Sequence, residues 1–288
     1  MHFLDDIART NLRELRKAIQ KGESYTRPWL DLNVAAFRAY REGRTATLPT
    51  PFCDDPIDRV MMGDVNGKEV LCLAGGGGQQ SAVFSLLGAS VTVLDLTPEQ
   101  LESDQVAARL YGYQVRTIQG DMRDLSILPD AHFDCVYQPI STLFVPDLRQ
   151  VYAGVARVLE PGGLYFADYA PPLTYLAHNQ GWDGTGYTLY ITEPYARGAI
   201  RETADGAMSF SRGELTGEFH HLLSDILNGL IDNGLSIRTV WENPRPEAAP
   251  GLDELEPGSE AHRQRYIPFG LSVLARKLSQ ESFHSMGW

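Results

Sequence analysis

The fold of this 288-residue chain is decided by the stretch Val70-Leu71-Cys72-Leu73-Ala74-Gly75-Gly76-Gly77-Gly78-Gln79-Gln80. Its first five residues form an unbroken apolar run, which is typical of a strand buried on both faces of a parallel sheet. The four glycines allow a tight turn, and residues 79–87 then have the pattern of a helix that ends at Gly88. A second apolar run, 91–95, finishes in Asp95. A strand, a glycine loop, a helix and a second strand ending in an acid predict a nucleoside-binding βαβ unit.

The same alternation continues over the next hundred residues. The apolar pattern predicts further strands over 115–119, 133–137 and 164–168, and helices over 98–111 and 151–159. Such alternation builds a parallel sheet with right-handed crossovers. Two last strands, 235–241 and 267–276, enclose a proline-rich stretch without room for a crossover helix, so we expect an antiparallel pair there. The predicted fold class is α/β: a doubly wound, mostly parallel, seven-stranded Rossmann-like sheet with an antiparallel last strand.

The residues outside this sheet predict an arm and an insertion. Residues 1–64 contain two stretches of helical spacing and then a linker with three prolines. We interpret them as an N-terminal helical arm or lid on a main domain that spans residues 65–288. Residues 170–212 show no clear period and are interpreted as an irregular lid insertion, after which a helix is expected over 215–233.

Composition excludes several classes of function. The chain has 25 Lys and Arg against 37 Asp and Glu, and its net charge of −12 opposes a nucleic-acid groove or docking on an anionic membrane. No apolar run has the length of a membrane span, and the first residues lack the pattern of a secretory signal. Cys53, Cys72 and Cys135 are scattered and odd in number, which is typical of a reduced, cytoplasmic protein. No residues have metal-ligand spacing, so no metal is expected.

Two acids indicate a nucleoside, but not a dinucleotide. Asp95 ends the second strand, where a carboxylate can accept both ribose hydroxyls. The dinucleotide fingerprint GxGxxG fails, because Gln80 stands where its last glycine should be. Directly after the third strand, Gly120-Asp121-Met122 offers an acid for an adenine amino group and an apolar side chain to cover the ring. Leu159-Glu160-Pro161-Gly162-Gly163 precedes the fifth strand.

In this order, these motifs resemble those of the class I S-adenosylmethionine-dependent methyltransferases, over residues 68–168. The glycine motif looks like that of a bacterial small-molecule subgroup. The common family pattern has an acid where this chain has Cys72, so the resemblance leaves Gln79 or Gln80 to contact the methionine amino group. It implies S-adenosylmethionine as the cofactor. The contacts that it implies are Ala74, Gly75, Gly76 and Gln80 at the methionine part, Asp95 at the ribose, Leu96, Asp121 and Met122 at the adenine, and Gln138 near the sulfonium.

The reaction implied by the resemblance is an in-line transfer of a methyl group to a small-molecule acceptor, for which the protein supplies proximity and alignment. A carbon or oxygen nucleophile usually also needs a base. His220 and His221 are candidates, and on a helix only one of them could face the site. The third catalytic candidate is Tyr169, at the end of the fifth strand.

Tyr25, Trp29 and His178 are the candidate acceptor contacts, because they lie in the two segments expected to cover the cofactor. Two rival functions stay open at this point. One is a nicotinamide-dependent oxidoreductase, which Gln80 opposes. The other is a nucleoside-binding protein without transfer activity.

Overall fold

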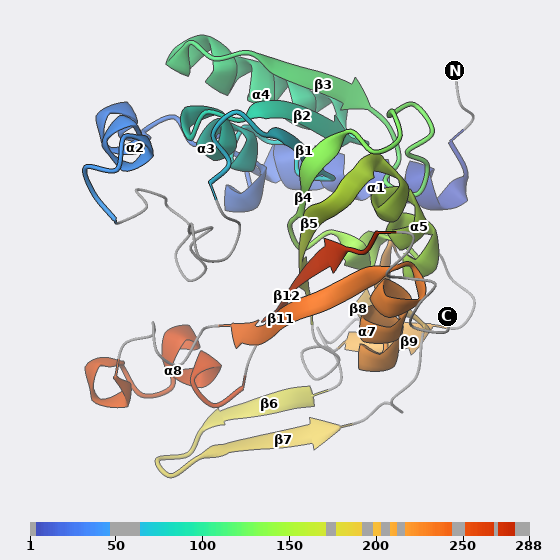
Figure 1. The fold of residues 1–288 in the computed structure, drawn as a ribbon. Coiled ribbons are helices and arrows are strands. Elements are labelled where there is room, and N and C mark those ends of the chain that lie inside the picture. Colours follow the sequence, from blue (N-terminus) through green and yellow to red (C-terminus); the bar gives the residue numbers. More distant parts are fainter. Residues whose placement is uncertain are drawn as a thin grey trace.

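The computed structural model describes residues 4–46, 64–170, 177–191, 198–202, 208–211, 217–243, 251–267 and 270–279. Most of the expected linker, with Cys53, lies outside these ranges. A seven-stranded sheet forms the centre of the fold (Figure 1). Its strands are, in spatial order, β11 (Leu235–Asn243), β12 (Gly270–Lys277), β5 (Leu159–Tyr169), β4 (Phe133–Gln138), β1 (Glu69–Leu73), β2 (Ser90–Asp95) and β3 (Val115–Gln119).

The directions of the strands confirm the predicted fold class. β3, β2, β1, β4 and β5 pair in parallel, whereas β12 runs antiparallel to both β5 and β11. The expected antiparallel pair at the end of the chain is therefore present. β5 begins at Leu159 instead of 164, so that Pro161-Gly162-Gly163 lies within the strand and does not precede it.

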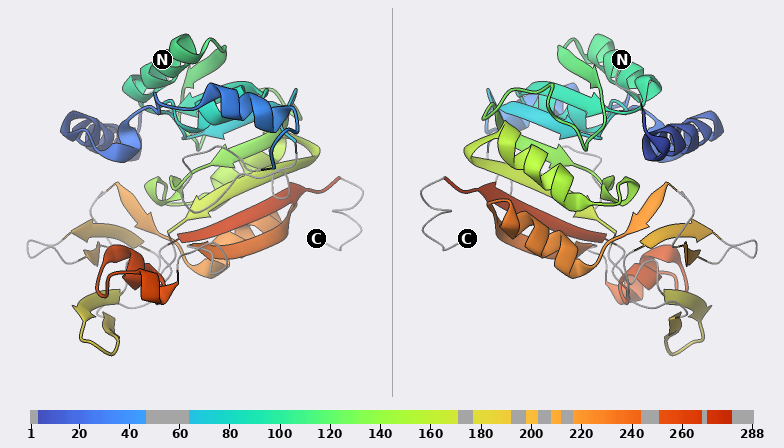
Figure 2. Two further views of the ribbon diagram at one scale, coloured as in Figure 1. Left: turned by 90° about the vertical axis from the view of Figure 1, so that its left-hand side faces the viewer. Right: turned by 90° about the vertical axis from the view of Figure 1, so that its right-hand side faces the viewer.

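Helices cover both faces of the sheet, as the two turned views show (Figure 2). Successive side chains of a strand point to opposite faces. Val70 and Cys72 of β1 accordingly join one buried cluster, and Leu71 and Leu73 join the other. The unbroken apolar run of β1 therefore reflects burial on both faces. The helices on the first side are α2 (Val34–Arg41), α3 (Gln80–Leu86) and α4 (Pro98–Tyr111), and those on the second are α5 (Leu148–Val158) and α7 (Leu223–Asp232).

The N-terminal arm begins with α1 (Asp6–Lys21) and continues through a short turn of helix, η1 (Ser24–Thr26), to α2. The Asn11 side chain on α1 donates to the carbonyl oxygen of Phe144, 2.7 Å away. One turn further on, Arg16 pairs with Glu99 in the first turn of α4. Because these partners follow β4 and β2, α1 lies over the carboxyl ends of the strands, where ligands bind in doubly wound sheets.

The insertion is more regular than expected. β6 (Ala177–Trp182) and β7 (Tyr187–Ile191) form an antiparallel hairpin, and β8 (Gly198–Glu202) pairs with both β9 (Met208–Ser211) and β10 (Glu218–His220). The expected loop between β11 and β12 also contains a helix, α8 (Glu260–Gln264). Trp182 and Tyr187 of the hairpin contact the rings of His262 and Tyr266, in and just after α8.

The prediction of a helix over 215–233 is wrong for the residues that precede Leu223. Residues 218–220 are the strand β10, and α7 begins only at Leu223, where the Asp225 carboxylate accepts a hydrogen bond from the Leu222 amide at 3.2 Å. Phe219 lies opposite Ala199 in the ladder between β10 and β8. Pairing with a strand some twenty residues earlier has overridden the local helical spacing.

Candidate functional site

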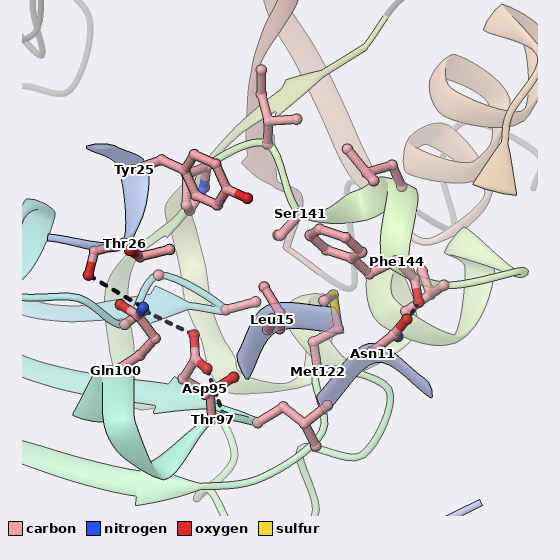
Figure 3. Close-up of a pocket in the computed structure, with 18 of the residues that line it drawn as sticks. Asn11, Leu15, Tyr25, Thr26, Asp95, Thr97, Gln100, Met122, Ser141 and Phe144 are labelled. Atoms are coloured by element: carbon pink, nitrogen blue, oxygen red, sulfur yellow. Dashed lines mark hydrogen bonds between the residues drawn. The ribbon is translucent and has the colours of Figure 1, made fainter. Parts of the chain in front are cut away.

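A cavity of about 470 Å³ lies at the carboxyl ends of the strands, under α1 (Figure 3). Its wall comes from the N-terminal arm, the glycine loop, the turns after β2, β3 and β4, and β10. Among the described residues it is lined by Asn11, Leu15, Tyr25, Thr26, Ala74, Gly75, Gly76, Gln79, Gln80, Asp95, Leu96, Thr97, Gln100, Asp121, Met122, Pro139, Ile140, Ser141, Leu143, Phe144, Val145 and Glu218.

The glycine loop passes directly against the end of β2. A Cβ atom on Gly76 would lie 2.9 Å from Cγ of Asp95 and 2.9 Å from Cβ of Gln100, so no other residue fits there without a shift. Gly77 takes a φ of 129°, a conformation that L side chains rarely adopt. Gly75 and Gly76 line the cavity. A ligand at this place therefore meets the backbone of the loop, with the Asp95 carboxylate beside it.

Asp95 joins the loop to β2 and lines the cavity. Its Oδ2 accepts a hydrogen bond from the Gly76 amide at 2.9 Å, and its Oδ1 accepts from the Thr97 amide at 2.8 Å. Burial raises the pKa of Asp95, and these amides act in the opposite direction. Each carboxylate oxygen can accept more than one hydrogen bond. Asp95 thus keeps capacity to accept hydroxyl groups from a ligand.

Asp104, on the buried side of α4, is a functional residue that the sequence analysis missed. Its carboxylate accepts hydrogen bonds from the amides of Gly77 (3.1 Å) and Gly78 (3.0 Å) and from the Ser81 hydroxyl. Burial raises the pKa of Asp104 to about 6, even though these hydrogen bonds lower it. Asp104 therefore holds the shape of the loop from behind. The sequence did contain a signal for Asp104: it lies three residues after the apolar Leu101, on the face of the helix that is expected to be buried.

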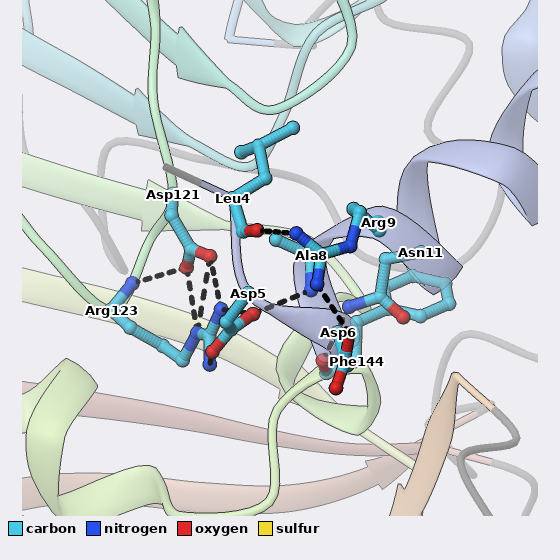
Figure 4. A network of polar contacts seen from close by, with 9 residues as sticks. All are labelled: Leu4, Asp5, Asp6, Ala8, Arg9, Asn11, Asp121, Arg123 and Phe144. Carbon is cyan, nitrogen blue, oxygen red and sulfur yellow. Dashed lines mark hydrogen bonds and ion pairs between the residues drawn. The ribbon is translucent and has the colours of Figure 1, made fainter. Parts of the chain in front are cut away.

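Asp121 and Met122 line the cavity after β3. An ionic network ties Asp121 to the arm (Figure 4). Asp121 accepts hydrogen bonds from the amide and the Nε of Arg123, at 2.9 and 3.0 Å from Oδ1. The same guanidinium contacts both carboxylate oxygens of Asp5, at 2.8 and 2.9 Å. The bond to Arg123 lowers the pKa of Asp5 to about 2. Because Asp5 caps α1 by accepting from the Ala8 amide, Arg123 fastens the start of α1 to the cavity. The sequence analysis missed Arg123.

Two glutamines hold η1 over the glycine loop. Nε2 of Gln79 donates to the carbonyl oxygen of Tyr25 at 3.2 Å, and Nε2 of Gln100 donates to that of Thr26 at 3.3 Å. Tyr25 and Thr26 both line the cavity. Trp29, in contrast, packs against the cluster under α2 and α3 and is not among the described lining residues. Of the two predicted aromatic contacts in the arm, the structure brings only Tyr25 to the site.

Gln138 and Tyr169 lie behind the cavity wall. The Gln138 amide is fully buried and donates to Sδ of Met122 at 3.3 Å and to Oγ of Ser141 at 3.1 Å, so it supports two lining residues. The Tyr169 hydroxyl accepts a hydrogen bond from Tyr152 of α5 at 3.1 Å. Burial raises the pKa of Tyr169 well above its usual value. The alternation of β5 turns Tyr169 into the core, and the structure does not support its predicted catalytic role.

The structure does not bring His220 or His221 to the described cavity wall either. His220 and His221 are buried, and neither is among the described lining residues. Nε2 of His221 lies 3.1 Å from the Thr142 carbonyl oxygen, and burial lowers the pKa of His221. The two histidines are not on a helix as expected, because His220 ends the strand β10 and His221 follows it. The backbone of His178 pairs with Tyr190 in the β6–β7 hairpin, and its side chain lies outside the described parts.

Glu218 is the residue of β10 that lines the cavity, and the sequence analysis did not select it. Burial raises the pKa of its carboxyl group. Gly217 precedes it at a φ of 85°, and a Cβ there would lie 3.2 Å from Oδ1 of Asn11. The chain thus passes against α1 as it enters the strand. The predicted helix over 215–233 gave no reason to place Glu218 at the cavity, because its position depends on the pairing of β10 with β8.

Comparisons with known proteins agree on one family. Residues 71–167 match the family model for a methyltransferase domain. The uncharacterized methyltransferase YbaJ of Bacillus subtilis is 29% identical over 233 residues, which are 81% of this chain and 89% of the Bacillus protein. A ubiquinone biosynthesis O-methyltransferase of Xanthomonas oryzae is 36% identical over 36% of this chain and 43% of its own length. The crystal structure of an S-adenosylmethionine-dependent methyltransferase from Mesorhizobium loti superposes with a TM-score of 0.61 at 26% identity, over 76% of this chain and 95% of that one.

With the sheet order and the cavity, these similarities show that the chain is a class I S-adenosylmethionine-dependent methyltransferase. S-adenosylmethionine is its cofactor. The cavity fits this cofactor. Gly75 and Gly76 leave the loop side of the cavity without side chains, and a Cβ on Gly76 would lie only 2.9 Å from Cγ of Asp95. The Asp95 carboxylate beside this loop keeps capacity to accept hydrogen bonds from the hydroxyl groups of the cofactor.

Proposed function

We propose that this enzyme methylates a small organic molecule held in the cavity under the N-terminal arm. The observation that carries the proposal is the cavity itself: about 470 Å³, concave and with a mostly apolar surface, within the range of small-molecule sites. Among its described lining residues there is no lysine, arginine or histidine. A nucleic-acid acceptor needs such cations for its phosphates. In the described ranges, no helix has the length and hydropathy to cross a bilayer.

The proposed roles of the lining residues follow from their positions. Ala74, Gly75, Gly76 and Gln80 would hold the methionine part, and Asp95 the ribose. Leu96, Asp121 and Met122 would enclose the adenine, with Gln138 supporting Met122 from behind. Tyr25 would contact the acceptor. In this proposal residues 1–64 are a lid, and residues 65–288 are the catalytic domain with a lid insertion at about 170–212. The β6–β7 hairpin of this insertion packs on the segment that contains α8.

The contribution of the protein is alignment in a closed site. When bound, S-adenosylmethionine supplies an electrophilic methyl group on a sulfonium. Gln79 and Gln100 hold η1 over the glycine loop, and the Asp5–Arg123–Asp121 network holds α1. These contacts position the arm so that it limits the access of water, and the acceptor is oriented from the side opposite the loop.

Calorimetry and isotope labelling together test the proposal. The enzyme should bind S-adenosylmethionine and S-adenosylhomocysteine but not NAD. Incubation with S-adenosylmethionine labelled in its methyl group and a bacterial extract should place the label in the small-molecule fraction. Label found only in the RNA or protein fraction would exclude a small-molecule acceptor. Binding of both sulfur compounds with no label in any fraction would favour the alternative of binding without transfer.

A further inference from the structure

We propose that Glu218 binds the nucleophilic group of the methyl acceptor and takes its proton, so that the enzyme methylates amines or neutral hydroxyl compounds and rejects anionic acceptors. This inference rests on the proposed function, because it concerns the acceptor end of the same cavity. The sequence analysis gave the role of the base to His220 or His221, which are buried and are not among the described lining residues. The structure favours Glu218 for this role, because its carboxylate lines the cavity.

Glu218 lies on the cavity wall beside the segment that follows β4. β10 packs against η2 (Thr142–Phe144), which follows β4 closely, and His221 holds the end of this strand against the Thr142 carbonyl oxygen. Burial raises the pKa of Tyr25, and nearby carboxylates, including Glu218, raise it further. Glu218 is therefore within electrostatic reach of Tyr25. Gln79 holds Tyr25 next to the loop, so Glu218 and Tyr25 share one end of the cavity.

The charges of the cavity wall favour particular acceptors. Asp95, Asp121 and Glu218 line it, with no cationic side chain among the described lining residues. A carboxylate or phosphate on the acceptor would meet Glu218 in a half-buried place, where repulsion is weakly screened. An amine or a hydroxyl group would instead donate a charge-assisted hydrogen bond to it.

The chemistry then balances without another reactant. The lone pair of the acceptor nitrogen or oxygen forms a bond to the methyl carbon, while the carbon–sulfur bond breaks and its electron pair stays on sulfur. The proton lost by the acceptor passes to the Glu218 carboxylate and from there to solvent. Burial raises the pKa of Glu218, which makes it a stronger base than an exposed glutamate.

The test compares two ligands that differ in charge at the reacting position. Sinefungin carries a protonated amine where the methyl group is transferred, whereas S-adenosylhomocysteine is neutral there. Calorimetry on the wild type should show a preference for sinefungin. In Glu218→Gln we expect this preference to fall by about tenfold or more, with the affinity for S-adenosylhomocysteine unchanged. Glu14→Gln is the matched control: Glu14 lies beside Gly217, pairs with Lys17 and is not among the described lining residues.

The outcomes separate the two proposals. An unchanged preference in Glu218→Gln, or an equal loss in Glu14→Gln, would overturn the role of Glu218 and leave the proposed function intact. Failure of the wild type to bind either ligand would count against the proposed function. If Glu218→Gln does not fold, Glu218→Ala replaces it in the experiment, and the same fall in the preference for sinefungin is expected. On an acceptor found by labelling, Glu218→Gln should lower kcat/KM about 10²–10⁴-fold. A labelled carboxylate or phosphate ester would also refute the inference.

Discussion

Replacement of Asp104 by Asn tests whether a buried carboxylate holds the glycine loop. Asn keeps the shape of the side chain, but it offers one acceptor oxygen in place of two and turns an N–H toward another donor. The amides of Gly77 and Gly78 and the Ser81 hydroxyl share the carboxylate in the wild type. The variant should therefore be less stable, and the size of the difference should depend on pH.

The magnitude follows from the pKa of Asp104. Burial raises this pKa from 3.8 to about 6 in the folded chain. The unfolded chain thus releases the proton first, and the wild type loses stability as the pH rises from about 4 to about 6. At 1.36 kcal/mol per pKa unit the full loss is about 3 kcal/mol. By the same linkage relation, about 1.4 kcal/mol of it falls between pH 5 and pH 7.5. Asp104→Asn lacks this dependence.

Urea unfolding of both proteins at pH 5, 6 and 7.5 measures the effect. The stability advantage of the wild type should shrink by about 1.4 kcal/mol from pH 5 to pH 7.5. Asp134→Asn is a control of opposite sign. Burial raises the pKa of Asp134, but the Lys68 ammonium and the Glu69 amide outweigh it and lower this pKa overall. The stability advantage of the wild type over Asp134→Asn should stay constant from pH 5 to pH 7.5, because it is lost only as the pH falls below about 4. A difference between wild type and Asp104→Asn that does not change with pH would refute the reasoning.

Three further predictions concern the same site. Asp95→Ala should weaken binding of S-adenosylmethionine at least about tenfold in calorimetry, since two charge-assisted hydrogen bonds are lost; an unchanged Kd in a folded variant would remove Asp95 from the site. Gly76→Ala should weaken it about tenfold or more, because the new methyl group lies 2.9 Å from Asp95 Cγ, whereas Gly186→Ala, which meets open space, should bind as the wild type does. Burial lowers the pKa of His221, so the wild type should lose stability as the pH falls through 6.5, and His221→Gln should lack this loss; a pH-independent difference in stability would contradict it.

The core of the fold could be predicted because its signals are local. The run from Val70 to Leu73 is apolar at every position, and only a strand covered on both faces requires that. The glycines of the loop and the acid after β2 are adjacent to their own strands, so spacing along the chain was sufficient to place them. Phe219 shows the opposite case. It pairs with Ala199 of β8, and no local pattern reveals such a partner.

The sequence by itself determined the βαβ order, the antiparallel last pair of strands, and the cavity residues that directly follow β1, β2 and β3. Only the tertiary structure decided which other side chains reach the cavity. Arg123 joins Asp121 to Asp5, which is 118 residues away, and Asp104 reaches the glycine loop across 26 residues. Glu218 lines the cavity because β10 is a strand instead of a helix. The physical reason is the range of the interactions: burial and turns depend on near neighbours, whereas the closing of a site depends on pairings between distant segments.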